Sequence, residues 1–357
     1  MVALGTLLVE PPLLNSSCPW ASEIDQLQAL YDCPSTGAVT TRTAILTGYV
    51  ETASNGVVFT RDTVASQNSY GHSPHPLTYY IDAVERILTA SPETSTKPFI
   101  ISITSSSPLS LANMLDAVQA LRARLGDAAR AHSRVGIELN TSCPNIQGSP
   151  PPAFVISALA PLLAVLTRYA RKDPTFAIGL KLPPYTYQTP FDELVRALTA
   201  LSFPEPSPTD ASRRRSPFAF LTTTNTLGQT ILFESQVTRP EDQGTNGLAP
   251  GKGPYALPTP LGGLGGDPIH ALSLGNVHTF RRLLDQNDEA LRAIVIVGVG
   301  GVTSKDAHRR MRAAGAGAVA CATLFGREGI RAFEMVSLED DEADLPPAHT
   351  SPTATVA

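Results

Sequence analysis

The sequence predicts one large (β/α)8 barrel, and three observations support this prediction. Eight short apolar runs alternate with segments that have the pattern of amphipathic helices. Nearly every run ends in polar residues, which in a barrel face one common mouth at the carboxyl ends of the strands. The chain has 357 residues, which is enough for a typical barrel of about 250 residues and leaves a surplus for surface insertions and a tail. A doubly wound sheet shares the βα alternation, but polar residues at nearly every strand end favour the closed barrel.

The expected strands, some with the loop residues that follow them, are 13–17, 38–44, 99–103, 135–145, 176–182, 218–224, 294–297 and 317–321. The expected helices are 23–30, 76–90, 109–130, 153–171, 191–201, 272–284, 304–314 and a last one from about 327. Ser22 is expected to cap the first helix and Gly37 to close it, and Ser304 is expected to cap the seventh.

Other segments have no helical or strand pattern. Residues 47–75 are rich in Gly, Ser, Asn and His, which predicts an irregular lid or binding loop. Residues 261–268 (L-G-G-L-G-G-D-P) predict a glycine-rich loop. We expect a single barrel domain over residues 11–337 with two surface insertions and a disordered tail. The insertions are expected at about 203–217 and 234–260, and the tail at 338–357.

Composition excludes several classes of function. The net charge is −5, which does not suit a nucleic-acid-binding domain, and no apolar run is long enough to span a membrane. No basic residue precedes Arg42, so we expect no mitochondrial presequence and a cytosolic protein. The four cysteines are scattered without a CxxC pair, which predicts neither a disulfide framework nor a metal site.

The end of the fourth strand carries a chemically suggestive set of side chains. Asn140 and Asn145 flank the thiol of Cys143. Carboxamides both donate and accept hydrogen bonds, which suits a planar ring with alternating N–H and C=O groups, and a thiol can act as an acid or a base. Taken alone, the stretch is equally compatible with a strand that ends in an Asn/Pro turn around a structural cysteine.

Two strand ends late in the chain suggest a phosphate site. The turn G-V-G-G (298–301) precedes a helix, and A-T-L-F (322–325) follows the last strand, which is where barrels often bind phosphate. The turn is neither a P-loop nor a Rossmann fingerprint, and a mononucleotide such as FMN fits it better. Lys181 could reach the flavin. A simple tight turn between strand and helix would also explain the glycines at 298–301.

These motifs resemble blocks of the dihydroorotate dehydrogenases, in particular the cytosolic class 1 enzymes, which use a cysteine base. E-L-N-T-S-C-P-N (138–145) resembles their strand-four motif, and G-L-K-L-P-P-Y (179–185) is similar to their flavin-lysine segment. Further blocks in matching order are N-T-L-G (225–228), G-G-L-G-G (262–266) and G-V-G-G (298–301), so that the resemblance covers about residues 11–335.

The resemblance implies FMN-dependent oxidation of dihydroorotate to orotate, in pyrimidine (UMP) biosynthesis in the cytosol. Cys143 would take a proton from C5 while a hydride passes from C6 to N5 of FMN. The implied substrate-binding residues are Asn68, Asn140, Asn145, Asn225, Thr226 and Arg42. The implied FMN-binding residues are Ser16, Ser17, Arg42, Asn140, Lys181, Gly300, Gly301, Ala322 and Thr323. The class 1A branch implies fumarate as electron acceptor and a homodimer.

Three positions depart from the family pattern. Arg42 stands where a lysine is usual, residues 70–74 lack one expected asparagine, and His270 stands where a lysine usually follows the glycines. A diverged paralogue with another substrate is therefore a second hypothesis, such as a flavin-dependent enone or dihydropyrimidine oxidoreductase. A flavin-free barrel lyase or isomerase that binds a phosphorylated substrate is a third, and a non-enzymatic descendant a fourth.

Overall fold

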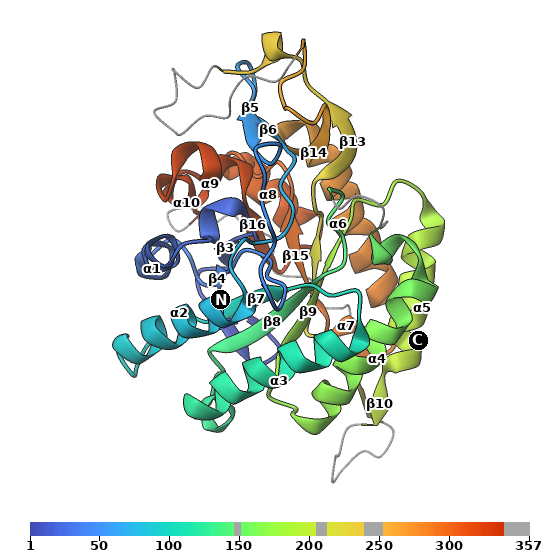
Figure 1. The fold of residues 1–357 in the computed structure, drawn as a ribbon. Helices are drawn as coiled ribbons and strands as arrows, with labels where there is room; N and C mark the ends of the chain where they lie inside the picture. The colour runs from blue at the N-terminus through green and yellow to red at the C-terminus, as the bar shows by residue number, and fades with distance from the viewer. Residues whose placement is uncertain (146–150, 205–212, 239–252, 339–357) are drawn as a thin grey trace.

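Eight parallel strands form one sheet in the structure, a computed structural model that describes residues 1–145, 151–204, 213–238 and 253–338 (Figure 1). In chain order they are β3 (Leu13–Asn15), β4 (Val39–Thr40), β7 (Phe99–Ile103), β8 (Val135–Asn140), β9 (Ile178–Leu182), β12 (Phe220–Thr223), β15 (Val295–Val299) and β16 (Ala318–Cys321). A parallel bridge between Leu14 and Ala38 joins β3 to β4, so that the sheet closes. The predicted (β/α)8 barrel is confirmed.

Helices surround the barrel strands (Figure 1). They are α1 (Ile24–Asp32), α2 (Leu77–Ala90), α3 (Pro108–Arg124), α4 (Ile156–Lys172), α5 (Gln188–Leu201), α6 (His270–Asp285), α7 (Glu289–Arg292), α8 (Lys305–Ala313), α9 (Thr323–Glu328) and α10 (Arg331–Val336). Short 3-10 turns lie at Pro19–Ala21, Asp127–Ala129, Pro152–Phe154, Glu234–Gln236 and Asp267–Ile269. None of these described helices is long and apolar enough to cross a membrane.

In most barrel strands, successive apolar residues divide between two apolar clusters. Leu13 and Ile101 pack outward under the helices, whereas Leu14 and Ile100 pack into the barrel interior, as the two-residue period of a strand requires. The interior cluster also contains residues of a short N-terminal hairpin, β1 (Val2–Leu4) and β2 (Leu7–Val9). This hairpin was not predicted from the sequence, and it fills the barrel from the end opposite the carboxyl ends of the strands.

A second sheet covers part of the mouth and corrects two expectations. Its order is β13 (Leu227–Ile231), β14 (Leu261–Gly266), β6 (Ala65–Asn68) and β5 (Val57–Phe59). Residues 47–75 therefore contain a hairpin, and 261–266 form a strand where a loop was expected. The glycines permit close packing of this strand, because a Cβ at Gly263 would lie 2.3 Å from Thr226 Oγ1.

Several helix ends also differ from the expected ones. The first helix begins after Glu23 and ends at Asp32, well before Gly37. Ser22 does not cap it, because its hydroxyl donates to Pro19 O at 2.7 Å. The third helix ends at Arg124 where Arg130 was expected. Where one last helix was expected from about Arg327, α9 starts at Thr323 and α10 at Arg331. The cap by Ser304 is confirmed, since its Oγ accepts from Ala307 N at 3.1 Å.

The expected insertions and tail fall largely outside the described residues, namely 205–212, 239–252 and 339–357. Of the first insertion, the described ends pair as β10 (Phe203–Pro204) and β11 (Arg214–Arg215).

Candidate functional site

Two cavities open side by side at the carboxyl ends of the barrel strands. The larger, of about 710 Å³, is lined by residues of β6 and of the loops after β4 and β8. The smaller, of about 470 Å³, is lined by residues after β12, β15 and β16. Both cavities share the wall formed by Ser17, Lys181, Asn225, Thr226, Ala322 and Thr323, so they form one continuous site.

Every residue that the sequence suggested for the site lines one or both cavities. The larger contains Arg42, Asn68, Asn140, Cys143, Asn145, Asn225 and Thr226, whereas the smaller contains Ser16, Gly300 and Gly301. Asn140 and Arg42, which the resemblance also assigned to the cofactor, line only the larger cavity of the two.

The carboxamide of Asn140 is fixed by hydrogen bonds on both sides. Its Nδ2 donates to Thr43 Oγ1 at 3.0 Å, and its Oδ1 accepts from the backbone N–H of Ser142 at 3.1 Å. Asn225 reaches the same cluster, since its Nδ2 donates to Ser142 Oγ at 2.9 Å. These contacts orient two carboxamides toward one cavity and leave part of their hydrogen-bonding capacity for a ligand.

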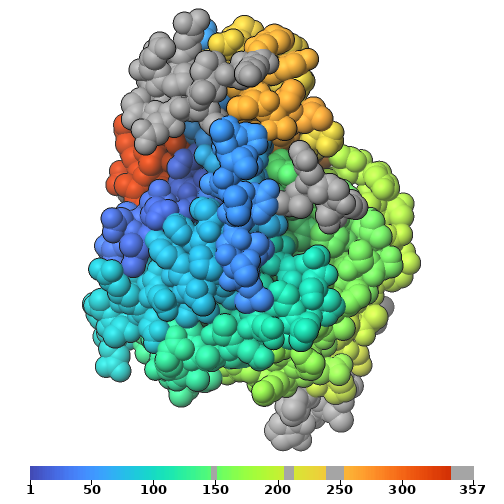
Figure 2. Space-filling view, viewed as in Figure 1, coloured from blue at the N-terminus to red at the C-terminus, as the bar shows by residue number. Residues whose placement is uncertain are grey.

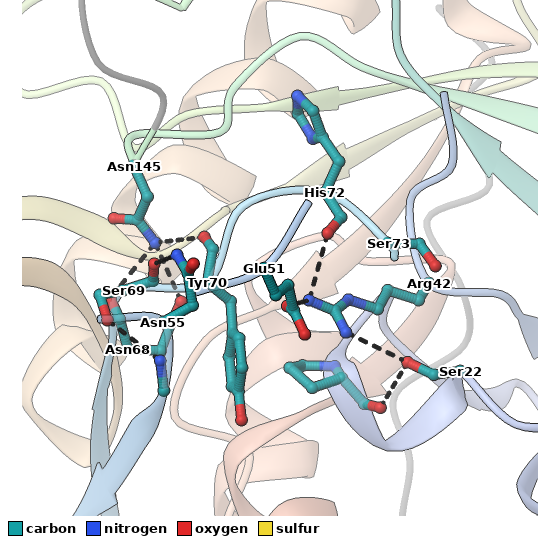
Figure 3. A network of polar contacts seen from close by, with 12 residues as sticks. Ser22, Arg42, Glu51, Asn55, Asn68, Ser69, Tyr70, His72, Ser73 and Asn145 are labelled. Carbon is teal, nitrogen blue, oxygen red and sulfur yellow. Dashed lines mark hydrogen bonds and ion pairs between the residues drawn. The ribbon is translucent and has the colours of Figure 1, made fainter. Parts of the chain in front are cut away.

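Asn68 and Asn145 form a second carboxamide pair on the other side of the cavity (Figure 3). Asn145 Nδ2 donates to Asn68 Oδ1 at 3.0 Å and to the carbonyl oxygen of Tyr70 at 2.8 Å. Asn68 Nδ2 in turn donates to Gly263 O at 3.2 Å. The second sheet thus positions this pair through β14.

Cys143 lies between these carboxamides, in the wall of the larger cavity. Burial raises the pKa of its thiol, while the backbone N–H of Asn145 and the positive charges of Lys181 and Arg42 lower it by less. The thiol is therefore protonated in most molecules at neutral pH, and only its thiolate form is a base.

Lys181 is a buried cation on the boundary between the two cavities. Lys181 is only 3% exposed. Its Nζ donates to Ser16 Oγ at 2.8 Å and to Ser17 O at 3.4 Å. Within the described part of the chain no carboxylate forms an ion pair with it. A buried ammonium group with neutral oxygen partners favours an anionic ligand next to it.

Glycines bring the backbone close to the smaller cavity. Gly300 and Gly301 have φ values of +123° and +66°, which L-residues with side chains rarely adopt. A Cβ at Gly300 would also lie 2.0 Å from Ser273 Oγ. Because these positions exclude a side chain, their backbone can approach a phosphate group closely.

Arg42 lines the larger cavity, but its guanidinium is already engaged by the protein. It forms an ion pair with Glu51, and its Nη2 also donates to His72 O at 3.3 Å. The guanidinium carbon lies 5.0 Å from the centre of the Tyr70 ring. Glu51 belongs to a segment without any motif, so its contact with Arg42 was not predictable from the sequence.

Several residues that line the larger cavity were not predicted as site residues: Cys18, Trp20, Thr43, Ser66, Tyr70 and His72. Burial, followed by the charge of Arg42, lowers the pKa of His72 to about 4, so this imidazole is neutral at physiological pH. Tyr70 and His72 could have been suggested by their place beside Asn68, whereas Trp20 had no comparable signal.

His270 supports the glycine turn from the first position of α6. Its Nδ1 lies 2.9 Å from Gly300 O, and Arg310 Nε donates to its Nε2 at 3.2 Å. Because Nε2 accepts, the proton is on Nδ1, which donates to Gly300 O. Among the described residues no cluster of His, Cys, Asp and Glu could hold a metal ion.

Comparison with known proteins agrees with this arrangement. The family model described as dihydroorotate dehydrogenase matches residues 15–340. A protein named "Probable dihydroorotate dehydrogenase A (fumarate)" from Streptococcus pneumoniae serotype 4 is 29% identical over 279 residues, which cover 77% of this chain and 72% of the relative. A "Putative dihydroorotate dehydrogenase A (fumarate)" from Streptococcus pyogenes serotype M5 is 28% identical over 277 residues, with the same coverage. These matches confirm the resemblance to the dihydroorotate dehydrogenases that the motifs indicated.

Proposed function

Because this chain belongs to the dihydroorotate dehydrogenase family and is an oxidoreductase of that type, we propose that it oxidises dihydroorotate to orotate with bound FMN. The observation that carries the proposal is the meeting of Cys143, four carboxamides and Lys181 around one continuous site. Dihydroorotate is a ring with alternating amide N–H and C=O groups, which such carboxamides can hold from several sides.

The residues present fit FMN. The smaller cavity has glycine backbone at the end suited to a phosphate, and the buried Lys181 stands where the two cavities meet. In this proposal Gly300, Gly301, Ala322 and Thr323 hold the phosphate, and Ser16, Ser17 and Lys181 contact the flavin ring. The positive charge of Lys181 favours the reduced flavin, which is an anion.

Cys143 is the base of the proposed reaction. Its thiolate takes the proton from C5 of the substrate, and the C5–H electron pair forms the new C5=C6 bond. The chemistry that FMN supplies when bound is acceptance of the hydride from C6. Asn68, Asn140, Asn145 and Asn225 hold the ring so that C5 faces the sulfur, and Thr226 contributes a hydroxyl.

Fumarate is the proposed electron acceptor, because the curated relatives carry it in their names. It takes two electrons and two protons and leaves as succinate, which balances the two electrons and two protons lost by dihydroorotate. We extend the proposal to pyrimidine biosynthesis, a cytoplasmic location, a homodimer and one barrel domain over residues 11–337. The support for these four points is the family resemblance.

The absorption spectrum of the purified protein tests the proposal. We expect flavin bands, their bleaching by dihydroorotate under anaerobic conditions, and their return on addition of fumarate. Absence of flavin would contradict the whole proposal and favour the flavin-free lyase. Flavin that dihydroorotate does not bleach would instead favour another substrate.

A further inference from the structure

The cation at the mouth of the substrate cavity is tied to a carboxylate of the same chain. Arg42 forms an ion pair with Glu51, and the two side chains are 8% and 27% exposed. Figure 3 shows the Glu51 carboxylate beside the Arg42 guanidinium, with the ring of Tyr70 close by. A second guanidinium nitrogen, Nη1, donates to Ser22 Oγ at 3.4 Å. The hydrogen-bonding fork of Arg42 is thus directed at protein groups.

Glu51 is held in place by the segment that carries it, residues 47–56, which we call the strap. On one side of Glu51, Tyr49 N donates to Ser73 O at 2.8 Å. On the other side, Asn55 Nδ2 donates to Ser69 O at 2.8 Å. The blue segment that contains the strap lies at the surface on the face seen in Figure 2. The strap is therefore anchored on both sides of the carboxylate.

The strap also packs closely on residues 70–72. A Cβ at Gly71 would lie 2.5 Å from the Tyr49 ring, so the aromatic ring rests directly on backbone. Tyr70 and His72, on either side of this glycine, line the cavity together with Cys143. Glu51 itself approaches Arg42 from the strap and is not part of the cavity wall.

We propose that Glu51 is a specificity-determining residue of the substrate cavity. Its carboxylate pairs with Arg42 and makes the guanidinium less available to a carboxylate of the ligand. Glu51 therefore lowers the preference of the site for a ring that bears a carboxylate over the same ring without one. The inference rests on the proposed function, because it takes pyrimidine rings as the ligands of this cavity. Two carboxylates that compete for one buried guanidinium cannot both be fully paired. The carboxylate left unpaired loses its hydration without gaining a charged partner, which is unfavourable.

Orotate and uracil test this inference, since they share the ring and differ in the carboxylate. We would measure both dissociation constants by titration calorimetry on the purified flavoprotein. Glu51→Gln should tighten orotate binding about tenfold, toward the lower end of the contribution of a hydrogen bond to a charged group. Uracil binding should change less than about twofold, because uracil has no carboxylate to compete with Glu51.

A double-mutant cycle sharpens the test. Arg42→Gln should weaken orotate binding, because it leaves the Glu51 carboxylate unpaired beside the cavity. The double variant, Arg42→Gln with Glu51→Gln, should bind orotate more tightly than Arg42→Gln alone and close to wild type. If Glu51→Gln alone does not fold, the comparison of Arg42→Gln with the double variant carries the same test.

Glu85→Gln is the matched control. Glu85 also forms an ion pair with an arginine, Arg124, at 2.7 Å, but it lies on α2, outside both cavities. Its variant should leave the orotate-to-uracil ratio unchanged. If wild type binds both ligands and Glu51→Gln does not change the ratio of the orotate and uracil dissociation constants, this inference alone is overturned. Wild type that binds neither ligand would overturn the proposed function and this inference with it.

Discussion

A thiol becomes a base only when it loses its proton, and this limits Cys143 at neutral pH. Burial raises the pKa of Cys143 above the ordinary value of 9.0, against the opposing charges of Lys181 and Arg42. A raised pKa means a smaller thiolate fraction at any given pH below it. Each unit of pH below the pKa therefore changes the thiolate fraction about tenfold.

We predict that flavin reduction by saturating dihydroorotate accelerates with pH, without levelling off below the ordinary thiol pKa of 9.0. The physical reason is the growing thiolate fraction of Cys143. Anaerobic stopped-flow measurements between pH 6 and 10 would show a slope of about one in log rate against pH on the acid side. A plateau reached below pH 8 would mean that the cations outweigh burial.

The next prediction concerns the identity of the base. Cys143→Ala should slow flavin reduction by about 10²–10⁴-fold, the usual contribution of a positioned base. The dissociation constant of orotate should change little, because the carboxamide contacts remain. Cys33→Ala is the matched control, since Cys33 is a buried cysteine at the end of α1, away from both cavities. Near-normal flavin reduction in Cys143→Ala would remove this residue from the mechanism.

Lys181→Met keeps most of the side-chain length and removes the charge. The buried ammonium donates to two neutral oxygens, so the variant loses a charge that stabilises an anionic reduced flavin. We predict a more negative flavin midpoint potential and a greater loss of FMN during gel filtration. Dye-linked reduction titrations measure the first and the flavin-to-protein absorbance ratio the second. An unchanged potential and full retention of FMN would show that Lys181 does not interact with the flavin.

At the scale of elements, the barrel strands were predictable because their apolar runs are short and end in polar residues. Strand β7 has the expected bounds, Phe99–Ile103. The second sheet was not predictable, because Gly262, Gly263 and Gly265 give β14 the composition of a loop. Its strand character comes from pairing with β6 and β13, which tertiary contacts impose and local propensity does not.

The residues of the candidate site also divide into those that a local sequence pattern predicts and those that only tertiary contacts bring to the site. Asn140, Cys143 and Asn145 were found because they lie at or just after the end of one strand, and barrel geometry gathers strand ends at one mouth. Glu51 could not be found in this way, because it reaches Arg42 from a segment with no periodic pattern. Its contact depends on the anchoring of the strap to residues 69–73, which no local sequence signal encodes.

The turn after β15 has a support whose effect can be measured. His270 bonds the carbonyl oxygen of Gly300 from the start of α6. We predict that His270→Ala weakens FMN binding several-fold, since one hydrogen bond contributes about 0.5–1.5 kcal/mol. Fluorescence titration of the apoprotein with FMN measures this effect. His278→Ala, at an exposed position of the same helix, should leave FMN affinity unchanged, and equal losses in both variants would contradict the role of His270.

At the scale of the whole molecule, the two ends of the barrel have separate tasks. The carboxyl ends of the strands carry polar residues that line the two cavities. The opposite end is filled by the N-terminal hairpin, whose Leu4, Leu7 and Val9 are fully buried in the interior cluster. Changes to the hairpin should therefore affect stability without affecting binding at the mouth.

The hairpin offers a paired test of this separation. Leu7 is fully buried, and a Cβ at Gly136 would lie 2.7 Å from its Cδ1, whereas its neighbour Leu8 is only partly buried. Leu7→Ala removes buried methyl groups and leaves a cavity, so we expect a loss of about 2–5 kcal/mol in the free energy of unfolding. Leu8→Ala should lose less, because adjacent strand residues face opposite sides.

Urea unfolding followed by circular dichroism measures both losses, and orotate titration measures the state of the mouth. Leu7→Ala should keep the orotate dissociation constant within about twofold of wild type, because the cost falls on the barrel interior and additivity holds for distant sites. Equal destabilisation by Leu7→Ala and Leu8→Ala would contradict the inward orientation of Leu7. A large change in orotate affinity would instead mean that the hairpin and the mouth are coupled through the interior cluster.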